Sequence, residues 1–233
     1  STGINPIPYP LPALPLSLWM RLPGADDEPA LIAAARKAYR VPAYADIVAA
    51  PGTQILIELL PRLAPAGPVT IIGPTYAEHG HAWRKAGFTV SETATPAETA
   101  ATIVIVNPNN PDGRVLSRAG LAELAAHCAG RGGLLVVDEA FADFTPEGSI
   151  VPELPDGTVV LRSFGKTYGL AGLRLGFAIG APGPMAQLKD ALGPWSVAGP
   201  ALHVGALALS DADWLAGTGR ERARDAARLD ALL

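Results

Sequence analysis

An aromatic ring, an amide, a carboxylate and a primary amine each follow a short apolar run of the sequence: Tyr76, Asn110, Asp138 and Lys166. A lysine amine is a nucleophile and a base when it is neutral, and a buried carboxylate favours a positive charge beside it. Each residue alone indicates little. If the preceding runs are neighbouring strands, we expect the four side chains to meet at one edge of a sheet.

The apolar runs before these residues are rich in β-branched side chains and have the length of strands buried on both faces. They are Val69–Gly73, Thr102–Val106, Leu134–Asp138, Thr158–Arg162 and Leu175–Ile179. Helical patterns separate several of them, and the clearest spans Ser117–Ala129, with Ser117 at the N-cap position. Alternating strands and helices predict an α/β fold with a mostly parallel sheet flanked by helices. Ligands of such sheets bind outside the carboxyl ends of the strands, where the four polar residues lie.

The rest of the chain divides by composition. Residues 1–24 contain five prolines by Pro15, and we expect them to form an irregular arm. Helices are expected at Glu28–Arg40, directly after Gly52, and at Asp213–Leu233. The last pattern has interleaved charges and ends without Gly or Pro, so we expect this helix to continue in a longer protein.

The composition excludes several classes of protein. The 233 residues have a net charge of −4, and no block of Lys and Arg marks a nucleic-acid binder. Gly and Pro interrupt the uncharged stretch Ala191–Ser210 too often for a membrane span, and no basic leader precedes the apolar N-terminal residues. Cys128 is the single cysteine, which excludes an intramolecular disulfide. We expect it to be a core residue of a cytoplasmic protein.

Two motifs that would indicate other chemistry are incomplete. Gly165-Lys166-Thr167 follows a strand, as in a phosphate loop, but Val160 stands where that loop requires glycine. His79 and His81 are two residues apart on an expected helix and therefore face different sides. No cysteine cluster accompanies them, so no metal site is expected. We interpret both histidines as surface residues or as partners in local hydrogen bonds.

Three motifs resemble those of the class I/II aminotransferases, which are pyridoxal-phosphate (PLP) enzymes of fold type I. Ser163–Arg174 (SFGKTYGLAGLR) is similar to the lysine motif of that family. Asn110–Gly113 (NPDG) and Asp138–Phe141 (DEAF) resemble two further motifs in the same order. Within the family, four segments look most like the L-threonine-O-3-phosphate decarboxylases of cobalamin synthesis: Ser1–Pro10, Ala50–Leu60, Gly73–Gly80 and Gly193–Leu202. Histidinol-phosphate aminotransferases are the near relatives.

The resemblance implies a role for each residue at the strand ends. Lys166 would bind the cofactor covalently and later move the substrate proton, and Asp138 would keep the pyridine nitrogen protonated. Asn110 would donate a hydrogen bond to the 3′-oxygen of the ring, and Tyr76 would stack on the ring. Phe141 stands where many relatives have a tyrosine that contacts this oxygen, so one hydrogen bond is expected to be missing.

The resemblance also implies a phosphate-binding group. Gly52, Thr53 and Gln54 open an expected helix, whose N-terminal amides and dipole favour an anion. Ser163 and Arg174 match the hydroxyl and the guanidinium that hold the cofactor phosphate in the family. Arginine can bind phosphate through two hydrogen bonds.

From the resemblance we expect decarboxylation of L-threonine O-3-phosphate, with transamination of histidinol phosphate or another amino acid as the first alternative. Leu22 lies near where histidinol-phosphate aminotransferases use a tyrosine, which favours the decarboxylase. The implied organisation is an arm at 1–24, a PLP-binding large domain at 25–212 and the start of an interdomain helix at 213–233. The small C-terminal domain of the family is not in this chain, so an inactive PLP-binding protein is the second alternative. The family implies a homodimer.

Overall fold

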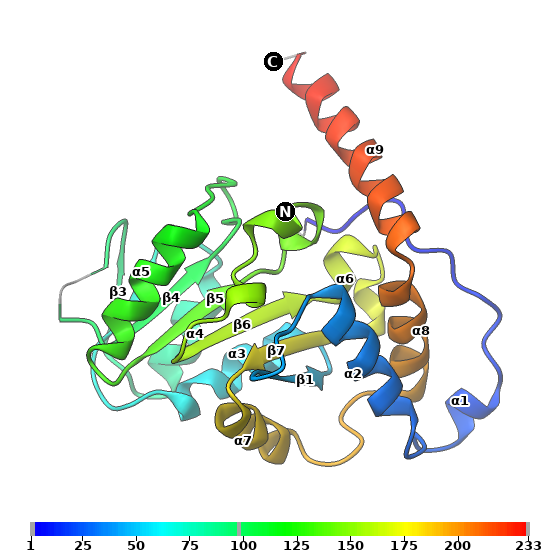
Figure 1. Ribbon diagram of the computed structural model, residues 1–233, viewed down its shortest axis with the longest axis horizontal. Helices are drawn as coiled ribbons and strands as arrows, with labels where there is room; N and C mark the ends of the chain where they lie inside the picture. Colours follow the sequence, from blue (N-terminus) through cyan, green and yellow to red (C-terminus); the bar gives the residue numbers. More distant parts are fainter. Residues whose placement is uncertain (1–2, 97–98, 232–233) are drawn as a thin grey trace.

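A seven-stranded sheet forms the centre of the computed structural model, which describes residues 3–96 and 99–231 (Figure 1). The strand order is β1-β7-β6-β5-β4-β2-β3. The strands are β1 Asp46–Ala50, β2 Val69–Ile72, β3 Val90–Thr93, β4 Thr102–Val106, β5 Leu134–Asp138, β6 Thr158–Ser163 and β7 Gly176–Gly180. Strands β2 to β6 are parallel, whereas β7 is antiparallel to both β6 and β1. The predicted α/β fold with a mostly parallel sheet is confirmed.

The five strands expected from apolar runs are present, each within one residue of its expected bounds. Two further strands were not expected. Strand β3 lies at the edge of the sheet and is mostly exposed, so its sequence lacks the apolar run that marks a buried strand. Strand β1 is the opposite edge, and it is a short segment between two helical patterns.

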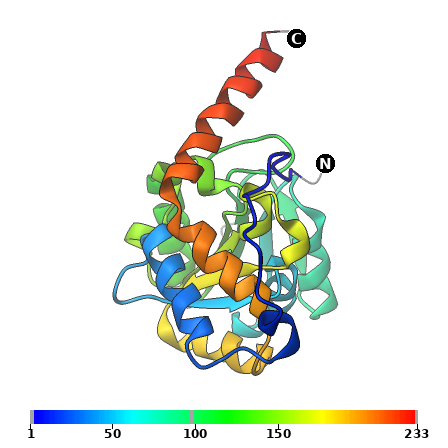
Figure 2. The ribbon, with the colours of Figure 1, turned by 90° about the vertical axis from the view of Figure 1, so that its right-hand side faces the viewer.

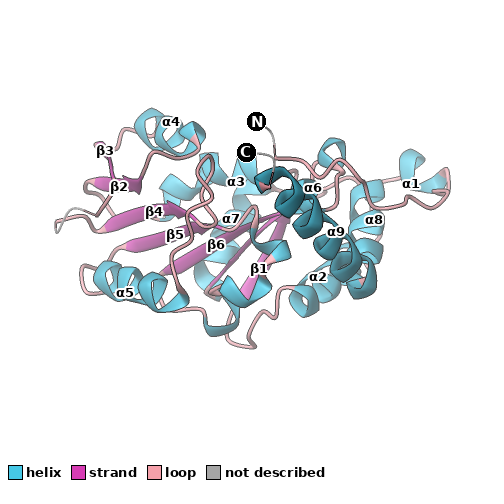
Figure 3. Cartoon of the chain, turned by 90° about the horizontal axis from the view of Figure 1, so that it is seen from above, coloured by secondary structure: helices cyan, strands magenta, loops and turns pink. Residues whose placement is uncertain are grey.

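Two layers of helices cover the sheet, as Figure 3 shows from above. Helices α2 (Asp27–Ala38), α5 (Arg118–Ala129) and α8 (Gly199–Ser210) pack on one face. Helices α3 (Thr53–Leu59), α4 (Ala77–Lys85) and α7 (Pro182–Leu192) pack on the other. Alternate residues of β4 divide between the layers, because Ile103 and Ile105 belong to one cluster and Val104 to the other.

The structure also tests several local expectations. Ser117 caps α5, since its Oγ accepts a hydrogen bond of 3.2 Å from the Gly120 amide. Cys128 is fully buried in the core, and burial raises the pKa of its thiol to about 11. The stretch Ala191–Ser210 forms the end of α7, a loop and α8. Among the described residues, no helix is both long enough and apolar enough to cross a membrane.

The two ends of the chain lie outside the sheet. The arm is irregular except for the short helix α1 (Ser17–Met20). Helix α9 (Ala212–Asp230) leaves the body of the molecule at an angle, and only Thr218 is buried along it (Figures 1 and 2). Ser1 and Thr2 of the expected arm, and Leu232 and Leu233 of the expected last helix, lie outside the described residues.

Candidate active site

A cavity of about 240 Å³ opens at the carboxyl ends of β4, β5 and β6. Val106, Asp138 and Ser163, the last residues of these strands, line it. All ten residues that the sequence indicated as a site line this one cavity: Gly52, Thr53, Gln54, Tyr76, Asn110, Asp138, Phe141, Ser163, Lys166 and Arg174. The parallel strands explain the convergence, since neighbouring loops that follow parallel strands lie at the same edge.

Asp138 is held from two sides at the end of β5. The residue is only 4% exposed. Oδ1 accepts a hydrogen bond of 3.0 Å from the Ala140 amide, and Oδ2 lies 2.9 Å from Nε2 of His79. Because a carboxylate accepts hydrogen bonds and cannot donate them, this second bond places a proton on Nε2. The carboxylate is therefore fixed in orientation and lines the cavity.

Lys166 lies in the short helix α6 (Phe164–Thr167), directly after β6. Its amine is 5.6 Å from the centroid of the Phe141 ring. Burial lowers the pKa of this amine, the nearby charge of Asp138 opposes that effect, and the charge of Arg174 adds to it. A lowered pKa increases the neutral fraction, which is the nucleophilic form.

Arg174 and Gly52 meet at one end of the cavity. Gly52 has a φ of +86°, and a Cβ at this position would lie 2.5 Å from Nη2 of Arg174. Only glycine therefore lets the guanidinium reach the start of α3. Arg174 itself has a φ of +53°, and its Nη1 donates a hydrogen bond of 3.3 Å to the carbonyl of Ala171. With Ser163 and the amides of the first turn of α3, the guanidinium forms a group of donors suited to a phosphate.

Tyr76 lies at the mouth of the cavity and is 42% exposed. Its hydroxyl is 3.5 Å from Oε1 of Gln54, whose Nε2 donates a bond of 3.0 Å to Glu78. Burial raises the pKa of Tyr76, and the charges of Glu78 and Asp138 raise it further. The phenol therefore stays neutral at the edge of the cavity that it lines.

Asn110 is placed by its neighbour Asn109, which is 7% exposed. The Asn109 side chain accepts a bond of 2.7 Å from Thr75 and donates one of 3.0 Å to the carbonyl of Pro74. These bonds join the loop after β4 to the loop after β2. They fix the positions of Asn110 and Tyr76 relative to each other.

Comparison with known proteins identifies the family. The model for aminotransferase class I and II matches residues 22–233. The chain belongs to the aminotransferase class I and II family. It is 45% identical over 217 residues to the threonine-phosphate decarboxylase of Pseudomonas aeruginosa, covering 91% of this chain and 64% of that protein. The chain therefore spans less than two thirds of the length of this relative.

Solved structures agree on the fold. The L-threonine-O-3-phosphate decarboxylase from Porphyromonas gingivalis superposes with a TM-score of 0.72 at 24% identity, covering 84% of this chain and 65% of that one. The histidinol-phosphate aminotransferase from Sinorhizobium meliloti, solved with pyridoxal-5′-phosphate, gives a TM-score of 0.74 at 21% identity, with coverage of 90% and 62%. The similarity to this PLP family and to threonine-phosphate decarboxylases that the motifs indicated is confirmed.

The residues present fit PLP, the cofactor of this aminotransferase family. The cavity has an amine that reacts with an aldehyde, a carboxylate for a ring nitrogen and a cationic end for a phosphate. The missing Cβ of Gly52 leaves the space that the cationic end requires.

The interpretation of His79 from sequence was wrong. His79 is fully buried and bonds to Asp138, which is far away in the chain, whereas His81 on the same helix is exposed. The spacing of the histidines gave no sign of this contact, because Asp138 lies 59 residues further along the chain. Asn109 was also missed, although it adjoins the expected Asn110.

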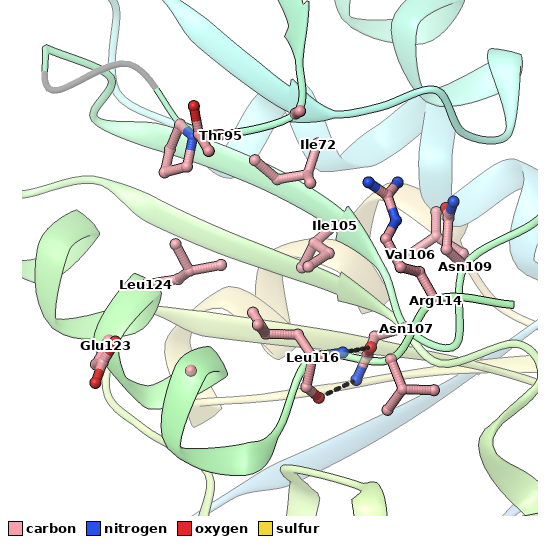
Figure 4. A pocket seen from close by; sticks show the side chains of 14 residues that line it. Ile72, Thr95, Ile105, Val106, Asn107, Asn109, Arg114, Leu116, Glu123 and Leu124 are labelled. Carbon is pink, nitrogen blue, oxygen red and sulfur yellow. Dashed lines mark hydrogen bonds between the residues drawn. The ribbon is translucent and has the colours of Figure 1, made fainter. Parts of the chain in front are cut away.

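A second cavity, of about 300 Å³, lies beside the loop that follows β4 (Figure 4). Apolar residues dominate it, including Ile72, Ile105 and Leu124, and Val106 lines both cavities. Asn107 closes its lower edge, where two hydrogen bonds of 3.1 and 2.8 Å join its side chain to the backbone of Leu116. Neither Asp138 nor Lys166 lines this cavity.

Proposed function

We propose that the protein decarboxylates L-threonine O-3-phosphate to aminopropanol phosphate and CO2, as a PLP enzyme of cobalamin biosynthesis. The observation that supports this most is the 45% identity to a threonine-phosphate decarboxylase over 91% of the chain.

In this proposal each side chain of the cavity has a separate role in the reaction. Bound PLP supplies a ring that withdraws electrons from a bond of the substrate. Asp138 keeps a proton on the ring nitrogen, and His79 holds Asp138 in place. Lys166 binds the cofactor and returns a proton to the substrate carbon that lost CO2. Tyr76 would pack on the ring, while Asn110 would donate a hydrogen bond to its 3′-oxygen.

The remaining residues of the cavity anchor the cofactor. Gly52, Thr53, Gln54, Ser163 and Arg174 would bind its phosphate through amides, a hydroxyl and the guanidinium. Phe141 contributes no hydrogen bond and instead places an apolar ring beside the Lys166 amine.

Transamination is the second candidate, because a solved histidinol-phosphate aminotransferase shares the fold. The two reactions differ in which bond at the substrate α-carbon is held perpendicular to the ring. The test uses the full protein with PLP and L-threonine O-3-phosphate, and follows CO2 and the cofactor spectrum together. Release of CO2 with return of the original spectrum supports decarboxylation. Conversion of the cofactor to its amine form without CO2 supports transamination, and no change in either supports a PLP-binding protein without activity.

A homodimer in the cytoplasm completes the proposal. Large apolar side chains are exposed on the arm: Leu11, Leu16, Trp19, Met20 and Leu22. A monomer rarely exposes such a surface without a partner. The division into arm, large domain and interdomain helix at 1–24, 25–212 and 213–233 belongs to the same proposal. Light scattering on the full protein tests the dimer, and fractionation of the source cells tests the location.

A further inference from the structure

The arm crosses the turn that contains Lys166. The amide of Asn5 donates a hydrogen bond of 2.9 Å to the carbonyl of Lys166, and its Nδ2 donates one of 2.9 Å to the carbonyl of Thr167. Tyr9 continues the contact with a bond of 2.9 Å from its amide to the carbonyl of Tyr168. Three successive carbonyls of the lysine turn are thus bound by the arm.

The same side chain reaches the last helix. Nδ2 of Asn5 also lies 3.3 Å from the hydroxyl of Thr218, the buried residue of α9. Its Oδ1 accepts bonds from the amide of Ile7 at 3.1 Å and from Nη1 of Arg222 at 3.3 Å. Asn5 therefore joins the arm, the lysine turn and α9, three segments far apart in the sequence.

The side-chain amide of Asn5 can make all the hydrogen bonds that this buried position requires. It is 7% exposed, and both of its donors and both lone pairs of its oxygen have partners. An aspartate of the same shape has no donor as an anion, so it cannot bind the carbonyl of Thr167, and it can bind the hydroxyl of Thr218 only as an acceptor. Burial makes the loss of such partners costly.

Two glycines allow the arm to lie this close. Gly169 has a φ of +65°, and a Cβ there would be 2.7 Å from the Cα of Pro8. Gly3 has a φ of +58°, and a Cβ there would be 2.5 Å from the Phe141 ring. Because Phe141 faces the Lys166 amine, the arm contacts the lysine both through its backbone and through its apolar neighbour.

We propose that Asn5 is a positioning residue for Lys166 and that it couples the lysine turn to helix α9. The inference rests on the proposed function only in taking Lys166 as the reactive amine. Movement of α9 relative to the arm would then change the position of the lysine.

The test compares Asn5→Asp and Thr218→Val in the full protein without cofactor. Asn5→Asp removes both side-chain donors, and Thr218→Val removes the acceptor on α9 without a change of size. Ile7→Ala is the matched control, since Ile7 is half exposed and its bond to Asn5 comes from its backbone amide. Hydrogen exchange of the Tyr168 and Gly169 amides is the first readout. The second is the pH dependence of acylation at Lys166, with the exposed Lys85 as internal reference.

We expect Asn5→Asp to speed exchange of these amides about fivefold to tenfold, which corresponds to the loss of one buried hydrogen bond. The midpoint of Lys166 acylation should move to higher pH, because a loosened turn exposes the amine to water and the new carboxylate favours the ammonium form. Only the shift in Thr218→Val, which adds no charge, reports the loosened turn alone. Thr218→Val should give a smaller change in the same directions. Unchanged exchange in Asn5→Asp, or an equal change in Ile7→Ala, overturns the positioning role. A Thr218→Val variant with an unaltered lysine turn overturns the coupling to α9.

Failure of the proposed function gives a different pattern. A wild-type protein that releases no CO2 would refute the decarboxylase. It would leave the exchange and acylation results readable, since neither uses substrate or cofactor.

Discussion

Nε2 of His79 lies 2.9 Å from Oδ2 of Asp138, and both side chains are buried. Helix α4 provides the histidine and strand β5 provides the carboxylate, so the bond joins a helix that covers the sheet to the carboxyl end of a central strand. Nδ1 of the same ring has no hydrogen-bond partner among the described residues. The only polar contact of the ring thus serves Asp138, which makes His79 a positioning residue for that carboxylate.

Replacement of this histidine should impair turnover more than cofactor binding. We expect His79→Leu to lower kcat about tenfold to a hundredfold, because a hydrogen bond to a charged group is worth roughly 1.5–3 kcal/mol. The phosphate end of the cavity is untouched, so the Kd for PLP should change little. Steady-state kinetics and a PLP titration measure the two quantities.

His81→Leu is the control for the His79 variant, since it lies on the same helix with an exposed side chain. Its kcat should equal that of the wild type. A His79→Leu variant with normal kcat would show that Asp138 needs no partner on α4.

The reactivity of Lys166 should depend on the charges around it. Burial and Arg174 lower the pKa of this amine, whereas Asp138 raises it. Arg174→Gln removes a cation that disfavours the ammonium form, so acylation of Lys166 should shift to higher pH. Asp138→Asn removes an anion that favours the ammonium form, so acylation should shift to lower pH. Mass spectrometry of the cofactor-free protein across a pH series measures both midpoints. Shifts in the same direction for the two variants would contradict the assigned charges.

The cationic end of the cavity should recognise the phosphate of the cofactor and no other part of it. We expect Arg174→Gln to weaken PLP binding about tenfold to a hundredfold, which corresponds to roughly 1.5–3 kcal/mol for bonds to a charged group. Pyridoxal lacks the phosphate, so its affinity should be the same in the variant and the wild type. Spectroscopic titration with both compounds measures the difference.

Arg114→Gln is the matched control for that titration, because Arg114 lines the second cavity and not the first. It should leave the affinity for PLP unchanged. Equal weakening of PLP and pyridoxal by Arg174→Gln would mean that the arginine supports the cavity wall and does not bind the phosphate.

Sequence reasoning located the site because its residues follow apolar strands directly. Asp138 and Ser163 are the last residues of β5 and β6, and Lys166 follows one turn later, so the chain order itself predicts the edge. The partner of Asp138 could not be found in this way. A single histidine on a helix gives no sign of a contact with a strand 59 residues away. Strand β3 was missed for a related reason, since an exposed edge strand has no apolar pattern.

The contacts of the arm were equally invisible in the sequence. Proline content predicts an irregular segment but not the carbonyls to which Asn5 binds. Hydrogen bonds between segments more than 160 residues apart depend on the folded arrangement of the whole domain. Patterns of residue type predict local structure and the ends of strands. They do not predict which hydrogen bonds join loops that are far apart in the sequence.

A buried ion-pair network beside the site should contribute strongly to the free energy of unfolding. Arg162 is 3% exposed, and its Nη1 donates to Oε2 of Glu139 at 2.6 Å, while its Nη2 pairs with Asp143. Burial tends to lower the pKa of this guanidinium, but Asp143 and Glu139 raise it above its ordinary value. Arg162→Met should therefore leave two buried carboxylates without their cation and reduce the free energy of unfolding by about 3–5 kcal/mol.

Arg118→Met is the comparison for this prediction, since Arg118 pairs with Glu153 at 3.0 Å on the surface. An exposed ion pair is worth about 0–1 kcal/mol, so this variant should unfold almost as the wild type does. Urea unfolding of the cofactor-free proteins measures both changes. Equal stability of the two variants at neutral pH would show that the buried network contributes no more than a surface pair.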